Sequence, residues 1–245
     1  MTIYGVTLLS GGLDSTTVTT LAKEEVDDLQ AITFHYGQTH SKEVECAVNI
    51  ADHLAISHHL LDISFLGDIA WYSALTNPDM FPIPKQRPTD QIGFGIPITY
   101  VPLRNTIFIS LAGAFLESNI LKAIESDSEN PNNVRARIYM APNAIDYSGY
   151  PDCRPEFYSK VKETLNEGSK MSLEYGVKFE IHTPIINSSK SDIAKLADNI
   201  GAPINMTWSC YEGGPLPCGN CDSCILRSNG YREAGLDDPI FTNVQ

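Results

Sequence analysis

The sequence has no surplus of basic residues and no long apolar run, and each absence excludes a class of protein. Lys and Arg number 17 against 30 Asp and Glu, so the formal net charge is −13. A field of that sign repels a phosphate backbone, which argues against a nucleic-acid partner. No apolar run approaches the roughly 20 residues of a membrane helix, and no basic stretch precedes the apolar N-terminal segment. We therefore expect a soluble, cytoplasmic protein that binds neither nucleic acid nor a membrane.

Cysteine is scarce outside one short stretch of the chain. Of 6 cysteines, four fall within fifteen residues: Cys210, Cys218, Cys221 and Cys224. Without a signal peptide, such clustering indicates metal ligation rather than a disulfide framework. The C-x7-C-x2-C-x2-C spacing fits four thiolates around a structural zinc ion, with an iron–sulfur cluster or free thiols as the alternatives. We expect residues 206–245 to form a small zinc-binding C-terminal segment.

The apolar periodicity predicts an α/β fold over residues 1–205. Short β-like runs at residues 3–9, 31–35 and 58–63 alternate with helical patterns. Such alternation gives parallel strands joined by helical crossovers, so we expect a Rossmann-like parallel sheet. Further strands are predicted at residues 137–140 and 179–182, and further helices over residues 107–120, 156–175 and 193–200.

Residues 76–102 interrupt this alternation. They contain six prolines with glycines between them. Because proline removes a backbone donor, such a stretch disfavours regular structure. We predict an irregular insertion that lies over an active site.

A loop rich in glycine and serine follows the first predicted strand. Its sequence is Ser-Gly-Gly-Leu-Asp-Ser-Thr-Thr over residues 10–17, which we call the glycine loop. Backbone N–H groups at such a strand-to-helix turn can bind an anion. The loop lacks both the Walker lysine and a G-x-G-x-x-G pattern, which disfavours γ-phosphate transfer and dinucleotide binding. The alternative is a tight turn that caps a helix.

The S-G-G-x-D-S-T pattern resembles the signature of the PP-loop ATP pyrophosphatases, which have an adenine nucleotide alpha hydrolase-like fold. These enzymes hold pyrophosphate and activate a substrate oxygen as an adenylate. The superfamily also has a lysine near a helix start after a proline-containing strand end, and Thr183-Pro184 followed by Lys190 resembles it. The resemblance implies ATP with Mg²⁺ along the following residues: Leu9, Ser10, Gly11, Gly12, Leu13, Asp14, Ser15, Thr16, Thr17, Val18 and Thr19.

Three further stretches, residues 33–38, 101–105 and 146–154, resemble the 7-cyano-7-deazaguanine synthases of the queuosine and archaeosine pathways. This resemblance covers nearly the whole chain. It implies a ligase that converts 7-carboxy-7-deazaguanine and ammonia to the nitrile through an adenylated acid and an adenylated amide. It also implies one structural zinc and a homodimer. The implied catalytic residues are Lys190, Asp14 and Arg104, and the implied substrate-binding residues are Asp146, Tyr147, Asp152 and Arg154.

Several alternatives stay open at the level of sequence. Lys190 could be a surface lysine at a helix start, Arg104 could form a helix-start salt bridge, and residues 146–154 could be a turn with satisfied polar groups. Ala141-Pro142 stands where the family pattern leads us to expect Gly-Val, and proline removes an N–H donor there. The chain could instead transfer an adenylated deazaguanine acid to another amine. It could also be a non-catalytic nucleotide-binding zinc protein.

Overall fold

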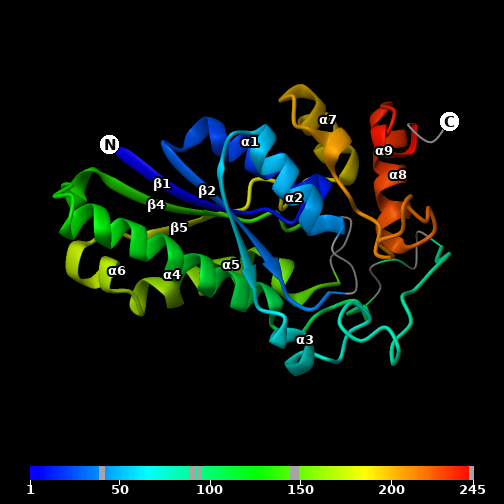
Figure 1. The fold of residues 1–245 in the computed structure, drawn as a ribbon, viewed down its shortest axis with the longest axis horizontal. Helices are drawn as coiled ribbons and strands as arrows, with labels where there is room; N and C mark the ends of the chain where they lie inside the picture. Colours follow the sequence, from blue (N-terminus) through cyan, green and yellow to red (C-terminus); the bar gives the residue numbers. More distant parts are fainter. Residues whose placement is uncertain (39–41, 89–91, 93–94, 144–148, 243–245) are drawn as a thin grey trace.

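A five-stranded parallel sheet forms the centre of the computed structural model, which describes residues 1–38, 42–88, 92, 95–143 and 149–242. The strand order is β3-β2-β1-β4-β5, and every neighbouring pair is parallel. From β1 the chain moves outward to β3, returns to the other side of β1 for β4, and continues to β5 (Figure 1). The strands are β1 (Thr2–Leu8), β2 (Asp28–His35), β3 (Ser57–Asp62), β4 (Val134–Tyr139) and β5 (Phe179–His182).

Helices cover both faces of this sheet (Figure 1). One face carries α1 (Leu13–Glu25), α2 (Lys42–His53) and α7 (Lys190–Asn199). The opposite face carries α4 (Arg104–Glu125), α5 (Pro155–Glu167) and α6 (Lys170–Tyr175). Buried apolar side chains fill the space between each helical layer and the sheet. The prediction of an α/β fold with a Rossmann-like parallel sheet is confirmed.

The helix α4 owes its apolar character to its place in the core. By length and composition it is the one helix in the described residues that could cross a membrane. However, Ile109, Ala112, Leu116 and Ile120 recur at intervals of three and four residues and are at most 2% exposed. They belong to the main cluster of buried side chains against the sheet. Packing in a globular core therefore accounts for the hydropathy of α4.

The single helix predicted over residues 156–175 is wrong, because the chain forms two helices there. Gly168 follows the last residue of α5, and its N–H donates to the Thr164 carbonyl oxygen at 3.1 Å. Ser169 then caps α6, since its Oγ accepts from the Ser172 N–H at 3.1 Å. A glycine followed by a capping serine offers the backbone a local alternative to a continuous helix. Three helices had no counterpart in the sequence prediction: α3 (Phe65–Ile69), α8 (Asp222–Ala234) and α9 (Pro239–Thr242).

Residues 76–102 form no helix or strand where they are described, and they are hydrogen-bonded to the cysteine-containing segment. Lys85 forms an antiparallel β-bridge with Cys221. The Gln86 N–H donates to the Asn220 carbonyl oxygen at 2.9 Å. Arg87 Nε donates to Asp222 Oδ1 at 3.1 Å, at the first residue of α8. The insertion and the start of α8 therefore hold each other in place at the carboxyl side of the sheet.

A buried ion pair fixes the end of the chain to α8. Arg227 donates to both carboxylate oxygens of Asp238, from Nε at 2.7 Å and from Nη2 at 2.9 Å. The two side chains are 2% and 7% exposed. Arg227 Nη1 also donates to the hydroxyls of Thr207 and Ser209, at 2.8 and 3.1 Å. One guanidinium thus ties together three separate parts of the C-terminal segment.

Replacing Asp238 with alanine should destabilise the protein strongly, because Arg227 would remain buried without its partner. We expect Asp238→Ala to lower the free energy of unfolding by about 3–5 kcal/mol, measured by urea denaturation. The neighbouring Asp237 is exposed, so Asp237→Ala should change it by less than about 0.5 kcal/mol. Equal losses in the two variants would show that the buried pair contributes nothing particular.

Candidate functional site

A cavity of about 340 Å³ opens at the carboxyl ends of the strands. Its wall includes Leu8 at the end of β1, Phe34 near the end of β2 and Met140 just after β4. It therefore lies where the strand order reverses between β1 and β4. In open α/β sheets the loops diverge at this point and leave a crevice, which is the usual position for a ligand. The glycine loop and Lys190 both contribute to the wall.

The glycine loop is held in a fixed shape by its own side chains. Ser10 and Ser15 hydroxyls lie 3.0 Å apart, and the Ser10 N–H donates to Ser15 Oγ at 3.2 Å. Gly11 has φ of +84°, and a Cβ placed there would lie 2.2 Å from the Glu43 carbonyl oxygen. Only glycine fits such a position. Gly12 is the N-cap of α1 without a side-chain cap, so the first N–H groups of this helix stay available to an anion.

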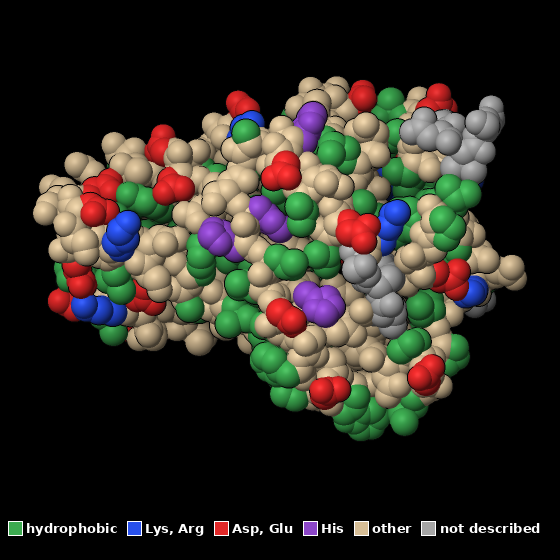
Figure 2. All heavy atoms as spheres, viewed as in Figure 1, with side chains coloured by type: hydrophobic (Ala, Val, Ile, Leu, Met, Phe, Trp, Pro, Cys, Tyr) green, Lys and Arg blue, Asp and Glu red, His purple; other side chains and the backbone are tan. Residues whose placement is uncertain are grey.

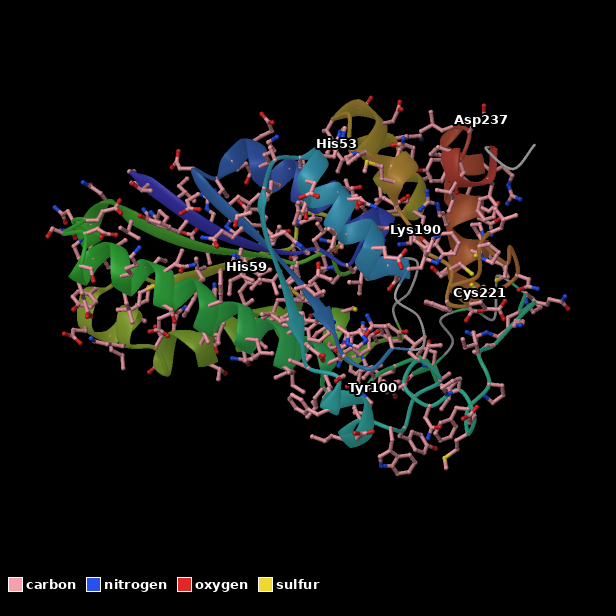
Figure 3. All side chains as sticks on the ribbon, viewed as in Figure 1. His53, His59, Tyr100, Lys190, Cys221 and Asp237 are labelled. Atoms are coloured by element: carbon pink, nitrogen blue, oxygen red, sulfur yellow. The ribbon has the colours of Figure 1, made fainter. Side chains whose placement is uncertain are left out.

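Lys190 forms an ion pair with Asp14 on the cavity wall. Lys190 is the first residue of α7, Asp14 lies in the first turn of α1, and Lys190 Nζ donates to Asp14 Oδ2. A capping box between Ser189 and Asp192 fixes the start of α7. From the other side, a Cβ at Gly230 of α8 would come within 2.6 Å of Lys190 Cβ. Three helices therefore contact Lys190, and Figure 3 shows it toward the same end of the molecule as Cys221.

Arg104 lines the cavity from the start of α4. Its guanidinium carbon lies 5.7 Å from the ring centroid of Tyr36 and 6.0 Å from that of Phe108. Its Nη1 donates to the Tyr36 hydroxyl at 3.4 Å. Phe108 in turn stacks on Phe34 with a centroid distance of 4.2 Å. One side of the cavity thus combines a guanidinium with a set of aromatic rings.

Two half-buried or buried carboxyl groups flank Arg104. Glu43, in the first turn of α2, lines the cavity, and burial raises its pKa to about 7 although Arg104 acts in the opposite direction. Asp152 is 5% exposed, and burial raises its pKa as well, although the positive charge of Arg104 lowers it. Its Oδ1 has no hydrogen-bond partner among the described residues. Both carboxyls are therefore costly to ionise where they stand.

The four clustered cysteines form a compact donor set next to the cavity. Their sulfur atoms all lie within 4.8 Å of one another. The N–H groups of Glu212 and Cys218 donate to Cys210 Sγ at 3.4 and 3.3 Å. Together with hydrogen bonds from the Cys221 and Cys224 thiols, they hold the pKa of Cys210 well below its usual range. Metal–sulfur bonds of about 2.3 Å place tetrahedral ligands about 3.8 Å apart, so these residues could hold a metal ion.

The structure brings together only part of the residues expected from the sequence. Of the expected ATP-binding stretch, six residues line the cavity: Leu9, Ser10, Gly12, Leu13, Asp14 and Ser15. The other five do not: Gly11, Thr16, Thr17, Val18 and Thr19. Three of these face the interior of the fold. Thr17 Oγ1 donates to the Leu13 carbonyl oxygen at 2.8 Å, and the hydroxyl oxygens of Thr19 and Thr7 lie 2.8 Å apart. Val18 packs in the hydrophobic core.

The two expected substrate-binding residues that the structure describes, Asp152 and Arg154, do not line the cavity. Asp152 is buried behind it, and Arg154 is exposed, with its Nε donating to the Pro151 carbonyl oxygen at 3.2 Å. Asp146 and Tyr147 lie outside the described residues. Ala141 and Pro142, which depart from the expected pattern, do line the cavity.

Sequence reasoning missed Glu43 and Phe108, and it gave no role to Phe34 and Tyr36, although both lie in the stretch 33–38 that carries the family resemblance. A usable signal existed for Glu43, since it is an acid in the first turn of the helix that follows the second predicted strand. Residues just after strand ends converge on one edge of a parallel sheet. Phe108 gave no such signal, because the apolar pattern of its helix predicts only that it packs in the core.

Comparisons with known proteins agree on one family. The family model described as "Queuosine biosynthesis protein QueC" matches residues 4–235. The chain is 43% identical over 244 residues to the 7-cyano-7-deazaguanine synthase of Syntrophus aciditrophicus, covering 98% of this chain and 97% of the relative. It is 44% identical over 237 residues to the 7-cyano-7-deazaguanine synthase of Picrophilus torridus, covering 96% and 90%. The similarity spans the whole site described above.

Replacing Asp152 with asparagine should change how stability depends on pH. A carboxyl whose pKa is raised by folding binds its proton more tightly in the folded state, so folding loses stability as pH rises above the usual value of 3.8. Asparagine cannot ionise. We expect the stability of Asp152→Asn relative to the unaltered protein to grow as pH rises from about 4 toward neutrality, measured by urea denaturation. A difference that stays constant over this range would contradict the assignment.

Proposed function

Because the chain belongs to the QueC family of queuosine biosynthesis proteins, we propose that it is a 7-cyano-7-deazaguanine synthase. In this proposal it is an ATP-dependent ligase that converts 7-carboxy-7-deazaguanine and ammonia to the nitrile. The observation that carries the proposal is the convergence of the glycine loop, Asp14 and Lys190 on one cavity. That arrangement suits a polyphosphate whose α-phosphorus is to be attacked by a substrate oxygen.

The first half of the reaction makes an amide. A carboxylate is a poor electrophile, so one of its oxygens attacks the α-phosphorus of ATP, and pyrophosphate leaves. The product is an acyl adenylate in which that oxygen now belongs to a good leaving group. Ammonia attacks the carbonyl carbon, the carbon–oxygen bond breaks, and AMP departs with the oxygen. A proton is released, and the amide remains.

The second half repeats the activation at the remaining oxygen. The amide oxygen attacks the α-phosphorus of a second ATP, and pyrophosphate again leaves. Loss of AMP then breaks the last carbon–oxygen bond while the nitrogen gives up its protons, which yields the nitrile. Both oxygens of the acid leave in AMP and no water is consumed, so the same loop serves both halves.

The roles of the cavity residues follow from their charges. The uncapped N–H groups of α1, with the Ser10 and Ser15 hydroxyls, bind the pyrophosphate portion of MgATP. Lys190 neutralises charge that builds up on the α-phosphate and leaving pyrophosphate, and Asp14 keeps its ammonium in place. Oxygen donors such as Asp14 also suit the Mg²⁺ that arrives with ATP. Arg104 can bind a phosphate or the substrate carboxylate.

We further assign a structural zinc ion to Cys210, Cys218, Cys221 and Cys224. Four thiolates form a closed tetrahedral set, which leaves no position for a reacting molecule. The ion would stabilise residues 206–245 as a segment that closes the cavity, because the Trp208 N–H donates to the Gly11 carbonyl oxygen at 2.8 Å. Loss of the ion should therefore disturb the glycine loop as well as the cysteines.

We also place this enzyme in the cytoplasm as a homodimer that binds small molecules and no nucleic acid. Acidic side chains are spread over the face shown in Figure 2, and basic ones do not gather into a patch there. An exposed apolar patch around α3 supports self-association: Phe65, Ile69, Trp71 and Tyr72 are 48–70% exposed.

The proposed reaction is tested by incubating the protein with 7-carboxy-7-deazaguanine, MgATP and ammonium, and following products by mass spectrometry. We expect the amide, then the nitrile, together with AMP. Lys190→Ala should lower kcat/KM by about 10²–10³-fold, since it removes a cation from the reacting phosphate. Lys195→Ala, an exposed lysine on the same helix, is the matched control. Absence of substrate-dependent AMP would contradict the function, and full activity of Lys190→Ala would contradict the role of that residue.

Elemental analysis of the purified protein tests the metal assignment. We expect about one zinc per chain and no iron. Cys224→Ser should lose the metal and unfold at a lower temperature. Cys46→Ser, which removes a thiol outside the cluster, should keep the metal. Stoichiometric iron with visible colour would instead indicate an iron–sulfur cluster.

A further inference from the structure

The carboxylate of Glu43 has no evident task in the reaction as described so far. Among the described residues that line the cavity, Asp14 and Glu43 are the two acids. Asp14 is engaged by Lys190. By contrast, the Glu43 carboxylate has no hydrogen-bond partner in the part of the chain that the structure describes, and it is half-buried. A ligand that brings N–H donors would stabilise a carboxylate in that position by hydrogen bonding to it.

The surroundings of Glu43 restrict which ligand that can be. Arg104 acts on it electrostatically and lines the same cavity. Its guanidinium lies over the Tyr36 and Phe108 rings, and Phe34 extends this aromatic wall. An acceptor and a cationic donor group are thus available together beside flat apolar surfaces. A planar heterocycle with donors and an acceptor on one edge matches this combination.

The deazaguanine base has such an edge. A carbonyl oxygen, a ring N–H and an exocyclic amino group follow one another along it. A carboxylate can accept from the two nitrogen donors at once, and a guanidinium can donate to the carbonyl oxygen. An ammonium ion also brings N–H donors, but Arg104 would repel a second cation placed beside it. The base edge therefore suits the site better than the nucleophile does.

We propose, on the basis of the proposed function, that Glu43 is the specificity residue that accepts the ring N–H and the 2-amino group of the deazaguanine base. Arg104 lies beside it and donates to the carbonyl oxygen, and Tyr36 and Phe108 contact the ring. The base then spans the cavity, with its carboxyl group directed toward the glycine loop and Lys190. This assignment gives Glu43 the role that the sequence suggested for residues 146–154.

A comparison of two substrates on the same protein tests this role. The first is 7-carboxy-7-deazaguanine, and the second is the same acid without the 2-amino group. The measured quantity is kcat/KM for AMP formation. The unaltered enzyme should prefer the first by about 10–100-fold, because the second leaves part of the half-buried Glu43 carboxylate without a donor. In Glu43→Ala the preference should fall to within about threefold. Misfolded protein lowers both rates equally and cancels from the ratio.

Glu45→Gln is the matched control, because Glu45 is exposed on the same turn of α2 and is absent from the cavity wall. It should keep the preference of the unaltered enzyme. If Glu43→Ala keeps the full preference, or only raises the KM for ammonium, the proposal is overturned. If the unaltered enzyme uses both bases equally well, it is also overturned. No AMP from either base would overturn the proposed function itself, and the inference with it.

Discussion

The reversal of strand order between β1 and β4 is the constraint on which the rest of the site depends. Parallel strands end at one edge of the sheet, and at this point the following segments turn away from each other and leave a crevice. Asp14 follows β1, Glu43 follows β2, Arg104 comes after β3, and Lys190 follows β5. Residues far apart in the chain thus reach one cavity because each comes soon after a strand or begins the next helix.

The C-terminal segment and the insertion are hydrogen-bonded to each other beside that cavity. Residues 85–87 are bound to residues 220–222, and Trp208 is bound to the glycine loop. The close contact of Gly230 with Lys190 extends the same connection to α7. The cysteine cluster takes no part in the proposed chemistry, but it lies next to the cavity and is connected to its wall. A metal there would hold a backbone that in turn contacts the glycine loop and Lys190.

Much of the fold could be predicted from the sequence, whereas the side of the cavity proposed to bind the base could not. The strands were predictable because β-branched runs and helical periodicity report burial directly. The break at Gly168-Ser169 was missed because good helix formers on both sides hid a local cap. The glycine loop was recognisable, since its shape depends on local sequence. Glu43 could have been found from its place just after the second strand, whereas Tyr36 and Phe108 reach Arg104 only through tertiary packing.

The most direct test of this account is to follow the oxygen atoms of the acid. 7-Carboxy-7-deazaguanine labelled with ¹⁸O at both carboxyl oxygens would be converted with unlabelled MgATP and ammonium, and the AMP, pyrophosphate and phosphate analysed by mass spectrometry. The account predicts that both labels appear in AMP, one atom in each of two molecules. Label in inorganic phosphate would indicate an acyl phosphate instead, and label in water would show that an oxygen leaves without adenylation. Either result would contradict activation of both oxygens at the α-phosphate.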